Sequence, residues 1–376
     1  MIFAFTDEQR ELAATLRRFL QDKSPSSEVR RLMATPEGYS PQTWAQLAGQ
    51  LGLQGLVVPE KYGGSGAGPV ELAIVCEEMG RALLCAPYFS TAVLAAHALL
   101  ASGDQGAAEE FLPALAEGAT IATLAVCEDS GAWTTDGLQT TARRSGDGYV
   151  LDGHKSFVLD GHTADLLLVV AQAEGGPSLF AVAGDAGGLS RRLLETLDMT
   201  RRQAALALDG VPARLIGAEG SAEDAVRRTL RLAAVALAAE QVGGAQRCLD
   251  MSVEYAKIRM QFGRPIGSFQ AIKHMCADLL LEVESARSAA YYAAWAAEEG
   301  SDELPLVSSV AKAFCSEAYF RAAADNIQIH GGIGFTWEHD AHLYYRRAKS
   351  AELMLGTPEE HREIAATYLI DGAARA

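Results

Sequence analysis

The chain has 376 residues, 49% of them hydrophobic, which predicts two or three globular domains rather than one core or a disordered chain. Its 32 basic and 48 acidic residues give a net charge of −16, and this balance argues against nucleic acid or an anionic membrane as the partner. There is no uncharged apolar run of membrane-span length and no basic start followed by an apolar core, so we expect a cytoplasmic protein.

The cysteines and histidines give no sign of a disulfide framework or a metal centre. The six cysteines are scattered without a Cys-x-x-Cys pair, which predicts reduced thiols. His274 and His330 belong to no cluster with metal-ligand spacing, so we expect structural hydrogen bonding from them and no metal site.

The first part of the chain has helical patterns. Thr6 to Gln9 forms a capping box ahead of Leu12, Leu16 and Leu20 on one face. Ser40 and Pro41 begin a second helix, which Gly52 ends. Three further helices are expected, at Val70–Leu84, Ser90–Ala101 and Gln105–Leu115.

Short strands separated by glycine and aspartate turns follow from about Gly118, and helical periodicity returns from about Ser221. Evenly spaced short strands predict a small antiparallel barrel or sandwich. The fold class is therefore α+β: a helical domain over 1–117, a central β domain over 118–218 and a C-terminal helical bundle over 219–376. The expected strands are Thr120–Cys127, Leu138–Ala142, Tyr149–Leu151, Leu166–Val170, Leu179–Ala183 and Ala204–Leu208.

A glycine- and proline-containing turn joins two long helical runs, Leu230–Lys257 and Ile272–Glu298. Arg259, Arg264 and Phe262 are concentrated there in an otherwise acidic chain. This pattern fits an anion site with a flat ring nearby, and equally a plain helix corner with solvated arginines.

The turn resembles the Arg-x-Gln-Phe-Gly-x-Pro-Ile-x-x-Phe-Gln signature of the acyl-CoA dehydrogenase family. Three other motifs stand in the family's order at about its spacing, and the resemblance covers essentially the whole chain. They are Pro59-Glu60-x-Tyr62-Gly63-Gly64, Gly153-x-Lys155 and Gln328-x-x-Gly331-Gly332-x-Gly334-Phe335.

The resemblance implies an FAD site that spans a subunit interface. Arg259 would contact the diphosphate, Phe262 would pack near the adenine end, and Gln270 would hydrogen-bond the cofactor. From the neighbouring subunit, backbone N–H groups at Gly331 and Gly332 would approach phosphate, together with Gln328. On the flavin side, the matching positions are Thr357 and Phe157.

Two segments depart from the family pattern on the flavin side. The family's Ser/Thr-Glu-Pro-x-Ala-Gly-Ser-Asp loop becomes Cys127–Thr134, which keeps Glu128 and loses the small polar residues. The family's Trp-Ile-Thr becomes Phe157-Val158-Leu159, so an aromatic ring remains and a hydroxyl is lost.

Both of the family's usual positions for the catalytic base lack a carboxylate. The base removes the proton from the α-carbon while hydride leaves the β-carbon for the flavin. The residue before Gly-Thr is Leu355, and the position 26 residues before Arg259 is Ala233. Other carboxylates near these positions are Glu240, Asp250, Glu352, Glu359 and Glu360.

Glu240 is the candidate for a relocated base. It lies two helical turns from Ala233 on the same face, about 10 Å along the axis. A helix carboxylate that pairs with a neighbour or lines an interface is the alternative interpretation. The acids Glu359 and Glu360 fit the start of a helix for dipole reasons alone.

The leading hypothesis is a subunit that desaturates an acyl-CoA thioester at the α,β position, in fatty-acid or steroid side-chain catabolism. It would complete the FAD site of a glutamate-bearing homologue in an α2β2 tetramer. One alternative is a self-sufficient homotetrameric flavoenzyme with Glu240 as base, or with flavin chemistry that needs no such base. The other is a non-catalytic scaffold subunit that has lost FAD.

Overall fold

The computed structural model describes residues 5–375, with side chains described up to residue 370, and divides them into two compact units. The first, here called the helical unit, comprises 5–30, 69–84 and 234–375. The second, here called the barrel unit, comprises 31–68 and 85–233. The domain bounds expected from the sequence remain a prediction.

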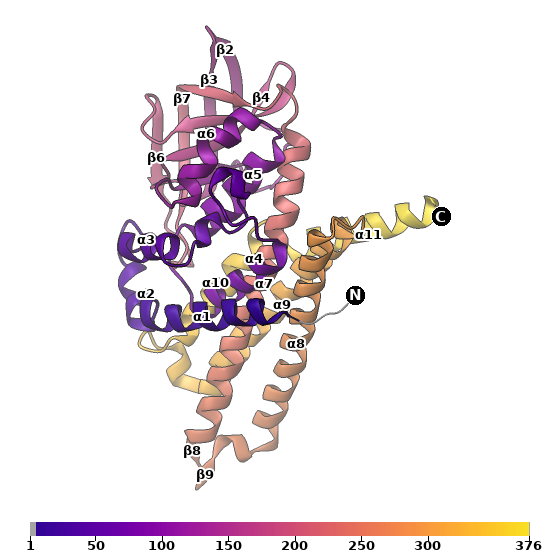
Figure 1. Cartoon of the computed structure of the whole chain (residues 1–376). Helices are drawn as coiled ribbons and strands as arrows, with labels where there is room; N and C mark the ends of the chain where they lie inside the picture. The colour runs from indigo at the N-terminus through magenta and orange to yellow at the C-terminus, as the bar shows by residue number, and fades with distance from the viewer. Residues whose placement is uncertain (1–4, 376) are drawn as a thin grey trace. The chain divides into compact units, whose positions relative to one another are not determined.

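The helical unit is built on long helices that lie next to one another (Figure 1). The end of α7 and the start of α8 are joined by the short pair β8 (Met260–Gln261) and β9 (Arg264–Pro265) and by a 3₁₀ turn at Ile266–Ser268. A second 3₁₀ turn, η5 (Gly331–Phe335), follows α9. The helices are α1 (Asp7–Lys23), α4 (Pro69–Arg81), α7 (Ala222–Ile258, of which residues 222–233 belong to the barrel unit), α8 (Gln270–Glu298), α9 (Leu304–His330), α10 (Ala341–Leu353) and α11 (Pro358–Arg375).

Close backbone approach fixes the α4–α7 contact. A Cβ on Gly243 would lie 1.8 Å from the Glu77 carbonyl oxygen, so only glycine fits there. Beside this contact the Tyr291 hydroxyl donates to Glu77 Oε2 at 2.7 Å, and Arg287 pairs with the same carboxylate. The two helices therefore pack at backbone distance, and α8 supplies the partners of the Glu77 carboxylate.

The strands of the barrel unit close into a ring, so of the barrel or sandwich expected from the sequence the structure has the barrel. The expected antiparallel arrangement holds for most pairings, but β1–β4 and β2–β4 are parallel. Strands β4, β2, β3, β7 and β5 pair in that order, and β5 pairs back with β4; β1 joins β4 in parallel and β6 joins β7. Its core is apolar, with Leu151, Phe180 and Val211 fully buried. The strands are β1 (Ala122–Ala125), β2 (Thr141–Ser145), β3 (Gly148–Leu159), β4 (Leu166–Ala173), β5 (Gly176–Ala183), β6 (Leu189–Leu193) and β7 (Gln203–Ile216).

Short helices precede the strands and continue the order helix, barrel, helix. They are α2 (Ser26–Leu32), α3 (Pro41–Gly49), η1 (Leu53–Gly55), η2 (Glu60–Tyr62), η3 (Phe89–Ala95), α5 (Ala96–Ala101) and α6 (Gln105–Ala116). The α+β fold class expected from the sequence is confirmed. None of the helices in the described chain is long and apolar enough to cross a membrane.

The structure confirms some of the local predictions from the sequence and differs from others. The Thr6–Gln9 capping box and the Ser40 cap, whose hydroxyl accepts from Thr43 N at 3.2 Å, are confirmed. The expected helix Ser90–Ala101 opens as a π-helix, η3. Strand β6 was not predicted, because Leu-Ser-Arg-Arg-Leu is mostly exposed and carries no apolar alternation.

Candidate functional site

The turn between α7 and α8 presents its cofactor candidates to solvent. The Ile266 N–H donates to Arg259 O at 2.8 Å and closes the turn. Phe262 lies at its tip with φ +52° and is 89% exposed, and the side chain of Arg259 is exposed as well. The Arg264 guanidinium lies 4.2 Å from the Phe269 ring centroid. The fold thus holds an aromatic ring and a guanidinium outward on a closed turn, while Gln270 begins α8 beside it, also exposed.

The end of α9 offers open backbone. Gln328 is exposed, Gly331 has φ +65°, and a Cβ at Gly331 or Gly332 would meet no heavy atom of the described chain within 4 Å. His330 is buried, with Nδ1 2.8 Å from Asn326 O and its ring stacked 4.3 Å from that of Tyr255. The glycines leave room for a phosphate to reach the backbone, and the histidine has a structural role.

In the barrel unit, a buried ion pair fixes the loop that follows β1. Lys155 Nζ donates to Glu128 Oε1 at 2.9 Å and to Val126 O at 3.0 Å, and Lys155 is fully buried. Burial works to raise the pKa of Glu128, but the N–H groups of Thr140 and Gln139 and the Lys155 ammonium outweigh it and lower that pKa to about 2. The glutamate that this loop shares with the family therefore holds the loop to β3.

Phe157 is pushed out of β3 by a bulge. The β3–β7 register shifts between Lys155 and Val158, and Phe157 sits between them with φ +58° and 41% of its surface exposed. A Cβ on Gly131 would lie 3.8 Å from the Phe157 ring, so the loop lies against it. Leu159, which stands where the family has threonine, is buried in the core.

The turn that carries the usual base position is held by two buried side chains. Leu355 is 6% exposed and has φ +63°, a left-handed conformation that is rare for leucine. Lys312 Nζ donates to Gly356 O at 2.8 Å, to Glu352 O at 3.0 Å and to Ser316 Oγ at 3.0 Å. His361 Nε2 lies 2.9 Å from Leu355 O. The turn is thus held by buried hydrogen bonds, and the side chain that it places at this position is apolar.

Thr357 caps the helix that follows this turn. Its hydroxyl accepts from the Glu360 N–H at 3.3 Å, and Glu360 Oε2 accepts from the Thr357 N–H at 2.7 Å. The arrangement is a capping box, which stabilises the start of α11. Glu360 is occupied by this cap.

The second of the family's usual base positions is also occupied by an apolar residue, Ala233. Ala233 is fully buried, and Glu240 on the same helix is 6% exposed. Glu240 Oε1 accepts from Arg347 Nη1 at 3.0 Å, and Arg347 is also buried. Of the remaining carboxylates, Asp250 pairs with Arg81 and Glu352 pairs with Lys349 at 3.0 Å.

Sequence reasoning missed the supporting residues. Lys312 was visible as a lone lysine in the apolar run Val310–Phe314, and His361 as a histidine four residues past Thr357. Only the folded chain brings both to the backbone of Leu355 and Gly356, since 43 residues separate Lys312 from Leu355.

Known proteins match most of the length of the chain. Models of the N-terminal, middle and C-terminal domains of acyl-CoA dehydrogenases match residues 6–119, 123–211 and 224–370. The acyl-CoA dehydrogenase IpdE2 of Mycolicibacterium smegmatis is 37% identical over 358 residues, which cover 94% of this chain and 96% of that protein.

Solved structures are also similar to this chain over nearly its whole length. The ChsE4–ChsE5 complex from Mycobacterium tuberculosis has a chain with a TM-score of 0.90 and 29% identity, covering 98% of this chain and 99% of that one. A variant of the Tcur3481–Tcur3483 steroid ACAD gives a TM-score of 0.87 and 33% identity, again covering 98% and 99%.

The match to all three domains of the family, on a fold of helices around a central barrel, defines a flavin-dependent oxidoreductase that acts on CH–CH bonds. This chain belongs to the acyl-CoA dehydrogenase family. The family uses FAD, which when bound supplies the acceptor for the hydride that leaves the substrate. The exposed Arg259 and Phe262 and the open backbone at Gly331 and Gly332 fit the phosphate and adenine end of that cofactor.

Proposed function

We propose that this chain is the base-less subunit of a heteromeric acyl-CoA dehydrogenase and completes the FAD site of a glutamate-bearing homologue. The observation that carries the proposal is Leu355, a buried leucine in a turn held by Lys312 and His361. A positioned base contributes about 10²–10⁴-fold to the rate, so a chain with leucine at this position needs a partner for efficient turnover.

The cofactor-end residues support the role of a contributing subunit. The α7–α8 turn exposes Arg259, Phe262 and Gln270. The end of α9 exposes Gln328 and, just after it, Gly332. Phe262 is 89% exposed, and the backbone at Gly331 and Gly332 has room for a ligand to approach. Their role would be to contact a dinucleotide shared with a second chain.

Two structural relatives support the assembly and the substrate class. One is a complex of ChsE4 with ChsE5, and the other is described as a steroid ACAD with two named components. By analogy, the assembly is an α2β2 tetramer and the substrate is a CoA thioester with a fatty or steroid side chain. The free cysteines support a reducing compartment, the cytoplasm.

A self-sufficient enzyme would need another base, and Glu240 is the candidate. Accepting a proton would remove the negative charge from its buried ion pair with Arg347. Breaking a buried pair costs about 3–5 kcal/mol, which disfavours Glu240 as a base that is protonated in every cycle. The buried ion pair therefore favours the heteromer over a self-sufficient homotetramer that uses Glu240 as its base.

The test is the visible absorption spectrum of the chain purified alone and after coexpression with a homologue that carries glutamate before Gly-Thr. We expect flavin absorption and turnover of an acyl-CoA only in the coexpressed sample. Full flavin with full turnover in the lone chain would overturn the proposal. If the coexpressed chains formed a stable complex and neither sample absorbed as a flavoprotein, the chain would be the non-catalytic scaffold.

A further inference from the structure

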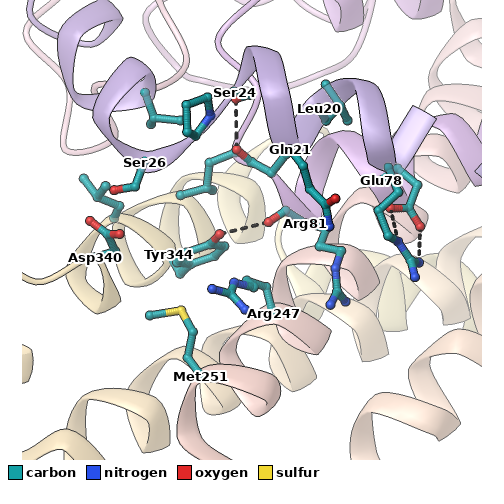
Figure 2. A pocket seen from close by; sticks show the side chains of 16 residues that line it. Leu20, Gln21, Ser24, Ser26, Glu78, Arg81, Arg247, Met251, Asp340 and Tyr344 are labelled. Atoms are coloured by element: carbon teal, nitrogen blue, oxygen red, sulfur yellow. Dashed lines mark hydrogen bonds and ion pairs between the residues drawn. The ribbon is translucent and has the colours of Figure 1, made fainter. Parts of the chain in front are cut away.

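A pocket in the helical unit is lined by α1, α2, α4, α7 and α10 and contains none of the residues discussed above for FAD or for the base (Figure 2). Its volume is about 290 Å³, at the lower end of the range of small-molecule sites. Part of the wall is apolar, formed by side chains that include Leu20, Val29, Leu83, Met251 and Leu343. The remaining wall is strongly polar.

The acids that line the pocket already have basic partners. Arg17 binds Glu78 with two hydrogen bonds, of which Nε to Oε2 measures 2.9 Å (Figure 2). Asp340 Oδ1 accepts from Arg30 at 2.8 and 2.9 Å. The pocket's acidic side chains are therefore neutralised without Arg81 and Arg247.

The two other arginines of the wall differ in their partners. Arg81 forms an ion pair with Asp250. Arg247 approaches Glu254 at 3.7 Å, longer than the 2.7–2.9 Å typical of a charge-assisted hydrogen bond, and that glutamate is 66% exposed. Tyr344, which also lines the pocket, donates its hydroxyl to Arg81 O at 2.9 Å. The pairs Arg17–Glu78, Arg30–Asp340 and Arg81–Asp250 leave about one weakly compensated positive charge, at Arg247.

We propose that this pocket binds a small monocarboxylate with an apolar tail, with its carboxylate on the Arg247 guanidinium. A guanidinium presents two parallel N–H donors that match the two oxygens of a carboxylate. A single spare positive charge beside Glu78 and Asp340 suits a monoanion better than a phosphate dianion. The tail would lie against Met251, Leu343 and Leu20.

The test is calorimetric titration of the purified protein, as the assembly that it forms, with hexanoate and with 1-hexanol. We expect hexanoate to bind in the wild type, hexanol to bind at least tenfold more weakly, and Arg247→Gln to weaken hexanoate at least tenfold. Arg227→Gln is the matched control on α7, because Arg227 is exposed and pairs with Glu223 and Asp224 outside the pocket. It should leave the titration unchanged.

A second variant guards against a folding artefact. Met251→Trp adds bulk to the apolar wall and keeps Arg247, so it should also abolish hexanoate binding. Undetectable binding to the wild type, equal binding of hexanol, or full binding to Arg247→Gln would each overturn the proposal. Hexanoate bound at an acyl-CoA site instead of this pocket would still bind fully to Arg247→Gln. The experiment does not involve FAD, so its outcome is independent of the proposed heteromer.

Discussion

The Lys312 ammonium lies 2.8 Å from the carbonyl oxygen of Gly356, in a site where the lysine side chain is fully buried. Burial lowers the pKa of Lys312 to about 8. The hydrogen bonds of Lys312 to the carbonyl oxygens of Gly356 and Glu352 hold the turn that places Leu355.

Replacing Lys312 by methionine should release that turn. The variant removes the lysine donor from the part-buried carbonyls of Glu352 and Gly356, which costs at most about 1–3 kcal/mol each. We expect a lower midpoint of chemical denaturation and a loss of flavin from the coexpressed complex. Lys257→Met, at an exposed position near the end of α7, is the control and should change neither. Wild-type stability and flavin content in Lys312→Met would contradict this account.

The same turn should weaken as the pH falls. Burial, and then the nearby Lys312 charge, lower the pKa of His361 from 6.5 to about 4. A histidine whose pKa is lowered on folding stabilises the folded state above its unfolded pKa, and this contribution is lost as pH falls from about 6.5 to about 4. We expect His361→Gln to remove part of the stability slope in that window.

Other buried histidines also have lowered pKa values, among them His97, His330 and His342. The informative quantity is therefore the difference in unfolding free energy between wild type and His361→Gln, measured by urea titration at pH 7.5, 6, 5 and 4.5. A difference that stays constant with pH would show that His361 does not titrate with unfolding.

Separating Glu240 from Arg347 should destabilise the chain, since both side chains are buried. We expect Glu240→Gln to lower the unfolding free energy by about 3–5 kcal/mol, and Glu240→Gln with Arg347→Met to recover much of the loss. Denaturation curves of the two variants test this. If Glu240→Gln instead kept wild-type stability and abolished turnover of the lone chain, Glu240 would be a base after all.

Arg259 should matter for the cofactor and not for folding. Its side chain is exposed, so Arg259→Ala should leave the thermal midpoint of the chain unchanged. A lost charge-assisted hydrogen bond to the diphosphate costs about 1.5–3 kcal/mol, or roughly ten- to a hundred-fold in FAD affinity. The ratio of flavin to protein absorbance in the coexpressed complex measures it, with exposed Lys257→Ala as the control.

The sequence predicted what depends on local pattern. Cap residues such as Thr6 and Ser40 bond groups three residues away, so their partners are visible in the chain itself. Strand periodicity predicted a barrel or a sandwich without deciding between them. The lack of a carboxylate at Ala233 and Leu355 followed from the spacing of these positions to Arg259 and Gly356. The sequence did not predict the π-helix at Phe89–Ala95 or the exposed strand at Leu189–Leu193, because neither has a distinctive local pattern.

By itself the sequence determined the fold class, the family motifs and the absence of a base at the usual positions, since these follow from residue identity and short-range spacing. Only the tertiary structure decided which charges meet. It paired Glu240 with Arg347, 107 residues apart, Glu128 with Lys155, and Lys312 with the carbonyl of Gly356. Burial makes those partners necessary, because an ion or a carbonyl removed from water is destabilising unless another group pairs with it. That group can come from a distant part of the sequence.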